Sequence, residues 1–160
     1  MGLLQAMVKT YRAERLSRGE LEQLQQRRLN ALVRFAKENS PYYRELFAKV
    51  GEEFRLEDLP ATSKPEMMAN FDRVLTDPAI TMRRIEEYTK DPDHIGRMID
   101  GKYLVFRTSG STGDPALVLY DKGCIDVSSA VAALRTFARP EDFRAFMRHG
   151  KRTAGAFADY

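Results

Sequence analysis

Apolar residues in the N-terminal half of the chain recur at helical spacing. Between residues 20 and 37 they stand every three or four positions, with glutamine, arginine and glutamate between them, which predicts an amphipathic helix. The apolar positions are Leu21, Leu24, Leu29, Leu32, Phe35 and Ala36. A weaker stripe predicts a preceding helix over residues 3–16, interrupted at residues 17–19. Its members are Leu4, Met7, Val8 and Tyr11.

Capping residues mark further helices in this half. Ser40 suits an N-cap and Pro41 the first helical position, so a short helix is expected over residues 42–50, before Gly51. Ser63 and Glu66 have capping-box spacing, which predicts a helix running toward residue 73. Another short helix is expected over residues 81–88. Its buried side would carry Met82, Ile85 and Tyr88, and Met67 and Met68 are expected to fill core gaps.

Two β-prone runs follow at residues 103–106 and 116–120. Both are rich in aromatic and branched residues, and together they predict a hairpin whose connection exceeds a two-residue turn. A helix is expected over residues 124–137, a shorter one over 141–148, and the start of a further strand over 150–157. We therefore expect one mixed α/β (α+β) domain over residues 1–160, with a mainly helical lead-in over 1–100 and the hairpin, helix and strand over 101–160.

Composition and charge narrow the class of protein. A hydrophobic content of 43% in 160 residues is typical of one globular domain. The net charge of +3 arises from nearly balanced acids and bases, which indicates a mixed solvated surface and no nucleic-acid partner. No apolar run approaches the ~18 residues of a membrane span, and no signal-peptide pattern begins the chain. We expect no membrane partner and a cytoplasmic location.

The single Cys124 and the two histidines give no metal-ligand pattern and no internal disulfide. Cys124 is predicted to be a buried or half-buried packing thiol, because no recognisable base accompanies it. His94, in a polar and turn-rich stretch, is predicted to be a surface residue. No catalytic residue and no metal ligand is identified from these residues.

The connection between the two strands is the strongest candidate for a binding site. Residues 107–115 are mostly small and hydroxylated, so the connection offers backbone N–H groups together with Ser and Thr hydroxyls. Such a loop can form a concave site for phosphate oxygens. The alternative is a flexible connector or a solvated turn. The segment is not a Walker A loop, because Asp114 and Pro115 follow Gly113 in place of Lys and Ser/Thr.

The order of these residues resembles a known signature. The six are Thr108, Ser109, Gly110, Ser111, Thr112 and Gly113, followed by Asp114-Pro115. This run is similar to the phosphate-binding motif of adenylate-forming enzymes, which include acyl-CoA synthetases, luciferases and peptide-synthetase adenylation domains. Many members carry Lys after the Pro, where this chain has Ala116. Members similar to phenylacetate-CoA ligase often lack that Lys.

The helical half resembles the same ligases. Residues 32–47, 59–64 and 70–72 look like the N-terminal helical region of phenylacetate-CoA ligase-like enzymes, and the resemblance extends from about Leu21 to about Phe157. It implies ATP, Mg²⁺, a small carboxylic acid and coenzyme A as ligands and substrates. In that family the adenine-binding motifs, the Mg²⁺-holding acid and the mobile C-terminal domain follow the Gly-rich loop. The resemblance therefore implies an incomplete N-terminal part of the large domain, inactive alone, whose partner is the rest of the enzyme beyond Tyr160.

The resemblance also implies roles for individual residues. The hydroxyls of Thr108, Ser109, Ser111 and Thr112 would contact the β- and γ-phosphates, and Gly110 and Gly113 would let the backbone approach them. Without Lys at Ala116, Arg107 or Lys122 could supply positive charge. Two alternatives stay open: a non-catalytic helical protein-interaction module in which the loop is a connector, and an adenylate-forming ligase with a non-CoA acceptor. The identity of the acid and the oligomeric state are not predicted.

Overall fold

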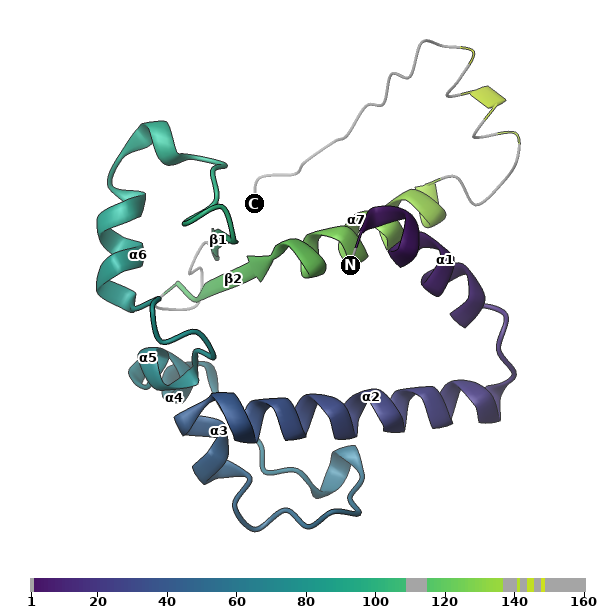
Figure 1. Cartoon of the computed structure of the whole chain (residues 1–160), viewed down its shortest axis with the longest axis horizontal. Coiled ribbons are helices and arrows are strands. Elements are labelled where there is room, and N and C mark those ends of the chain that lie inside the picture. Colours follow the sequence, from purple (N-terminus) through teal and green to yellow (C-terminus); the bar gives the residue numbers. More distant parts are fainter. Residues whose placement is uncertain (1, 109–114, 137–140, 142–143, 146–147, 149–160) are drawn as a thin grey trace. The chain divides into compact units, whose positions relative to one another are not determined.

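The computed structural model describes residues 2–108, 115–136, 141, 144–145 and 148 (Figure 1). These residues form helices and one two-stranded antiparallel sheet, so the predicted mixed helix and strand content is confirmed. The helices are α1 (Leu3–Ala13), α2 (Arg18–Asn39), α3 (Pro41–Leu46), α4 (Lys64–Ala69), α5 (Phe71–Val74), α6 (Met82–Thr89) and α7 (Lys122–Thr136), with short 3₁₀ turns η1 (Leu56–Asp58) and η2 (Pro92–His94). The chain divides into two compact units, one of residues 1–15 and 123–160 and the other of residues 16–122.

Helix α2 begins at a capping box that the sequence contains but that we did not predict. The backbone N–H of Glu20 donates to Ser17 Oγ at 3.4 Å, and the Glu20 carboxylate accepts from the Ser17 N–H at 2.9 Å. The hydrogen bonds from Ser17 lower the pKa of Glu20, because they favour the charged carboxylate. The helix predicted over residues 20–37 is confirmed and is longer by two residues at each end.

The buried side of α2 differs from the prediction. Val33 is 4% exposed, whereas Leu32 and Phe35 are 63% and 51% exposed. Segment 50–54 covers the side that carries Val33, and polar α2 side chains hold it there: Gln26 Nε2 donates to the Phe54 carbonyl at 2.7 Å, and Lys37 Nζ donates to that of Val50 at 3.3 Å. The prediction rested on the spacing of apolar residues. The side of α2 that is covered depends instead on Gln26 and Lys37, whose side chains bind the backbone of segment 50–54.

Helix α1 confirms the first predicted helix and ends at Ala13, three residues earlier than predicted. Ala6 is almost fully buried, whereas three members of the predicted stripe are exposed. These are Leu4, Val8 and Tyr11. The guanidinium carbon of Arg15 lies 3.4 Å from the centroid of the Tyr11 ring, so the two side chains form a cation–π contact.

Helix α3 starts as predicted and ends earlier than predicted. Ser40 is its N-cap and accepts from the Tyr43 N–H at 3.3 Å, and Pro41 occupies the first position. The helix ends at Leu46, because the backbone of Phe47 leaves the helical region. The buried Phe47 ring stacks on Tyr43 at a centroid distance of 5.4 Å. In Figure 1, α3 lies beside the C-terminal end of α2.

The helix predicted to run toward residue 73 is two helices. The capping box at Ser63 and Glu66 is confirmed, with the Ser63 N–H donating to the Glu66 carboxylate at 2.9 Å. Asn70 then interrupts the helix with non-helical backbone angles, while its side-chain amide donates to the Glu66 carbonyl at 3.0 Å. Asparagine competes with the helical backbone for such hydrogen bonds, which accounts for the break.

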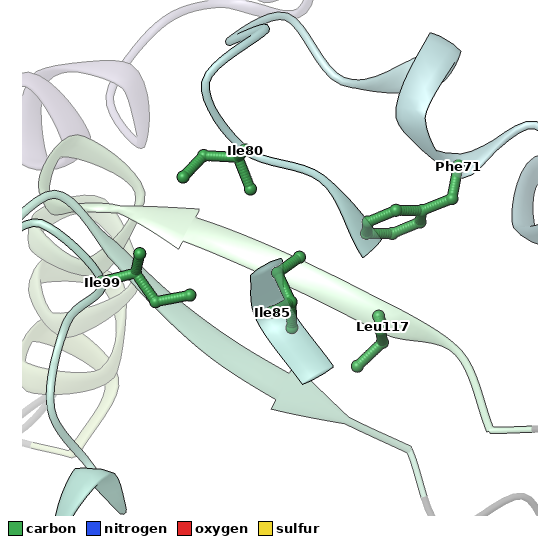
Figure 2. Close-up of a cluster of buried hydrophobic side chains, with 5 residues drawn as sticks. All are labelled: Phe71, Ile80, Ile85, Ile99 and Leu117. Carbon is green, nitrogen blue, oxygen red and sulfur yellow. The ribbon is translucent and has the colours of Figure 1, made fainter. Parts of the chain in front are cut away.

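One hydrophobic cluster forms the core of the unit that contains residues 16–122. Its buried members are Phe71, Ile80, Ile85, Ile99 and Leu117. In Figure 2, Ile85 of α6 lies between Ile99 and Leu117, in front of the two strands. Met82 and Tyr88 pack against the cluster, as does Met68, which confirms the predicted buried side of α6. Thr81 caps that helix by accepting from the Arg84 N–H at 3.2 Å.

The predicted hairpin is confirmed. Strands β1 (Tyr103–Arg107) and β2 (Leu117–Asp121) pair antiparallel, with Val105 opposite Leu119. Alternating residues of both strands pack on the cluster, including Tyr103 and Val105. The other face carries Phe106, which is 45% exposed and whose ring centroid lies 4.8 Å from that of Tyr120.

Helix α7 follows β2 directly and corrects the prediction for Cys124. Its buried residues are Asp126 and Ala130, while Cys124 is exposed. On a helix, Cys124 lies on the side opposite Asp126, so it cannot pack with the buried face. The predicted strand over residues 150–157 lies outside the described residues, and so does half of the helix predicted over 141–148; residues 141, 144, 145 and 148 are described and helical. Among the described residues, no helix is both long enough and apolar enough to cross a membrane.

Candidate functional site

The strand ends that flank the Gly-rich segment meet at Thr108 and Ala116. The Thr108 N–H donates to the Ala116 carbonyl at 3.0 Å. The Ala116 N–H donates in turn to Thr108 Oγ1 at 2.8 Å, so a side-chain oxygen closes the last pair of the ladder. The segment between them therefore leaves the sheet and returns to it at neighbouring points.

Thr108 keeps its hydroxyl hydrogen for a ligand. A hydroxyl donates one hydrogen bond and can accept two. The Thr108 oxygen accepts from Ala116, and no described residue accepts its hydrogen. Because Thr108 is exposed, that hydrogen can be donated to an anionic oxygen. The phosphate contact expected of Thr108 stays a prediction.

The other predicted phosphate contacts lie outside the described residues. These are Ser109, Gly110, Ser111, Thr112 and Gly113. The structure therefore confirms the strand on either side of the Gly-rich segment, and it shows Thr108 as an exposed residue at the end of β1. The contacts of the segment with phosphate remain a prediction.

Arg107, the cation next to the segment, shares a hollow with the last turn of α6. The hollow is lined by Glu86, Thr89, Lys90, Val105 and Arg107. Lys122, the other cation that the sequence analysis considered, does not line it. Lys90 was not identified from the sequence. Alternation along β1 could have indicated it, because Val105 and Arg107 share the face of the strand that packs on the cluster. Helix α6 packs on that face through Ile85, so the end of α6 comes close to Arg107.

The half-buried carboxylate of Asp77 stabilises the end of the hairpin farthest from the Gly-rich segment. Asp77 accepts from the Ala79 N–H at 3.0 Å and from the Tyr103 hydroxyl at 2.9 Å. Both bonds hold the pKa of Asp77 below its usual range, and the bond from the Ala79 N–H has the larger effect. Burial, followed by the bond to Asp77, raises the pKa of Tyr103. The pair ties the loop before α6 to the start of β1.

His94 is held by its neighbours and forms no catalytic dyad with another described residue. Its ring stacks on that of Tyr88 at a centroid distance of 4.0 Å, and its Nδ1 lies 3.0 Å from the Tyr88 carbonyl. Asp91 Oδ2 is 3.9 Å from Nε2. The predicted surface position is therefore only partly right, because the stacked ring is half-buried.

The described residues contain no group of three or more His, Cys, Asp or Glu side chains placed to hold a metal ion. Comparisons with protein-family models, with curated proteins and with solved structures find no match to this chain.

Proposed function

We propose that the chain is the N-terminal part of an ATP-dependent carboxylate-CoA ligase, similar to phenylacetate-CoA ligase. The observation that carries the proposal is the run Thr108 to Gly113, placed between two strands that pair up to Thr108 and Ala116. A connector without a function needs neither this order of hydroxyls and glycines nor an outward hydroxyl at its base. The mixed helix and hairpin architecture is compatible with the proposal.

The proposed chemistry requires donors where charge develops. A carboxylate attacks the α-phosphorus of ATP, pyrophosphate leaves, and the acyl group then passes from the adenylate to coenzyme A. The departing pyrophosphate gathers negative charge, which preorganised N–H and hydroxyl donors stabilise. The part proposed for this chain is to hold the β- and γ-phosphates. Mg²⁺ bound to the nucleotide would add positive charge there.

The test is a titration of the ¹⁵N-labelled chain with Mg²⁺-ATP followed by amide chemical shifts, which detects millimolar affinities. The amides of residues 108–113 are expected to shift in the wild type and to stay unshifted in Gly110→Val. Valine adds a Cβ where the phosphate must approach and disfavours a positive φ. Gly51→Val is the matched control, because a Cβ at Gly51 meets nothing within 4 Å. Unshifted amides in the wild type, or equal shifts in Gly110→Val, overturn the proposal.

A second candidate function, a helical protein-interaction module, is favoured by one observation. Leu21, Leu32 and Phe35 lie on one exposed side of α2, away from Val33. The sequence downstream of Tyr160 separates the two functions, because the ligase requires a Tyr/Gly/Thr-Glu type motif there. A ligase with a non-CoA acceptor is distinguished from a CoA ligase by its product, because the adenylate would form but no thioester would follow.

A further inference from the structure

The hollow between α6 and β1 has an uneven distribution of charge. Lys90 follows the last turn of α6, and Arg107 ends β1. Glu86 is the one carboxylate among the lining residues, so positive charge dominates. Val105 supplies an apolar wall. The hollow can therefore receive a small anion beside an apolar surface.

Neither cation of the hollow is neutralised within the described part of the chain. No described carboxylate lies within 4.0 Å of Lys90 Nζ or of the Arg107 guanidinium, although Glu86 lines the same hollow. The carbonyls at the C-terminal end of α6 attract Lys90 but do not pair with it as a carboxylate would. Thr89 contributes no free hydroxyl hydrogen, because its Oγ1 donates to the Glu86 carbonyl at 3.3 Å.

We infer that Lys90 and Arg107 form a subsite for the terminal phosphate of a bound polyphosphate. A guanidinium can donate two parallel hydrogen bonds to a phosphate, and an ammonium adds a point charge. Arg107 directly precedes Thr108 in the chain, so the hollow lies where β1 leads into the Gly-rich segment. This inference rests on the proposed function, and it supplies the positive charge that Ala116 does not.

The position of Glu86 gives the subsite a second signature. Its carboxylate repels a phosphate in the same hollow, and at close range this repulsion is only partly screened by salt. Removal of the Glu86 charge should therefore strengthen polyphosphate binding, whereas removal of the Lys90 or Arg107 charge should weaken it. A change in net charge alone would give effects of the same sign, so each variant is compared with a variant that makes the same change in charge outside the hollow.

The experiment is a titration of the full ¹⁵N-labelled chain with inorganic tripolyphosphate at fixed ionic strength. Lys90→Gln and Arg107→Gln are each expected to weaken binding about tenfold, the effect of one lost hydrogen bond to a charged group. Arg83→Gln is the control, since it removes the same charge from the same helix but does not line the hollow. Arg107→Lys should give an intermediate affinity, because it keeps the charge and loses the paired donors.

The carboxylate arm compares Glu86→Gln with Glu87→Gln, which differ by one position on α6 and only the first of which lines the hollow. Glu86→Gln is expected to tighten binding about threefold relative to Glu87→Gln. Spectra of the unliganded variants check that each is folded.

The outcomes separate the subsite from the proposed function. Shifts at residues 108–113 with equal affinities for Lys90→Gln, Arg107→Gln and Arg83→Gln overturn the subsite and leave the proposed function standing. Shifts in the hollow alone overturn the placement of the subsite beside a phosphate loop. Absence of shifts at millimolar tripolyphosphate in both places overturns the subsite and the proposed function together.

Discussion

Asp77 shows what a single carboxylate does for the hairpin. It receives one hydrogen bond from the Ala79 backbone and one from Tyr103, which lies 26 residues further along the chain. Both bonds favour the charged carboxylate, so its pKa is lowered in the folded state. The folded state then binds fewer protons at this position than the unfolded chain, and stability rises with pH across the interval between the two pKa values.

We predict that this contribution is fully present above the ordinary aspartate pKa of about 4. It is lost as the pH falls through the lowered pKa of the folded state. Asp77→Asn should therefore lose less stability than the wild type between about pH 5 and pH 2. Urea unfolding at a series of pH values measures both slopes.

Asp93→Asn is the control for this prediction. The Asp93 carboxylate accepts no hydrogen bond from a described residue, so the variant should keep the wild-type slope. Parallel pH profiles for Asp77→Asn and the wild type contradict the contribution assigned to Asp77.

Among the elements, α2, α3 and α5 meet at Ser40. This serine is the C-cap of α2 and the N-cap of α3. Its hydroxyl, fully buried, also donates to the Arg73 carbonyl of α5 at 2.9 Å. Ser40 therefore serves the end of α2 through its backbone N–H, which donates to the Ala36 carbonyl, and its side chain serves the start of α3 and ties it to α5.

Ser40→Ala should destabilise the protein more than Ser63→Ala does. Loss of an N-cap costs about 1 kcal/mol, and this is the whole effect expected at the exposed Ser63. At Ser40 the part-buried hydrogen bond to the Arg73 carbonyl is lost as well, which adds about 1 kcal/mol. The free energy of unfolding, from urea denaturation, gives both values. Equal losses would show that the bond to Arg73 contributes nothing.

Element starts could be predicted from the sequence because their causes are local. Ser40 and Ser63 act on amides three residues away, and these start signals were interpreted correctly. The same kind of signal at Ser17 was overlooked. The buried side of α2 could not be predicted in this way, because it depends on Phe54 and Val50, which reach α2 only after the chain has turned back.

The candidate site was predictable to a similar extent. The β-prone runs predicted the hairpin that carries Thr108 and Ala116, since alternation and turn residues are local signals. The position of Lys90 and Arg107 in one hollow was not predictable, because it arises only when α6 packs on β1. A resemblance in sequence identifies the Gly-rich segment but does not locate such a neighbour.

At the scale of the whole molecule, the unit of residues 16–122 depends on one small cluster. The cluster joins α5, α6 and β2 with the residues before and after α6. With so few buried side chains, damage at the centre is expected to loosen the whole unit and not one element.

Ile85→Ala is therefore expected to lower the free energy of unfolding by about 2 to 4 kcal/mol. Ile85 is 0% exposed, and alanine would leave a cavity at the centre of the cluster. Ile95→Ala is the matched control and should change stability by less than about 0.5 kcal/mol, because Ile95 is 83% exposed. Amide exchange in α6 and β2 should accelerate together in Ile85→Ala. Faster exchange in α6 alone would show that the cluster does not unite the unit.

The bond from the Ala116 amide to the Thr108 hydroxyl has a consequence for occupancy of the neighbouring segment. Hydrogen bonds in a chain polarise one another, so an oxygen whose own hydrogen is donated becomes a better acceptor. A bound anion that takes the Thr108 hydrogen would strengthen the link to Ala116 across the strands. Binding of an anion by the Thr108 hydroxyl would therefore also strengthen the last hydrogen bond between the ends of β1 and β2.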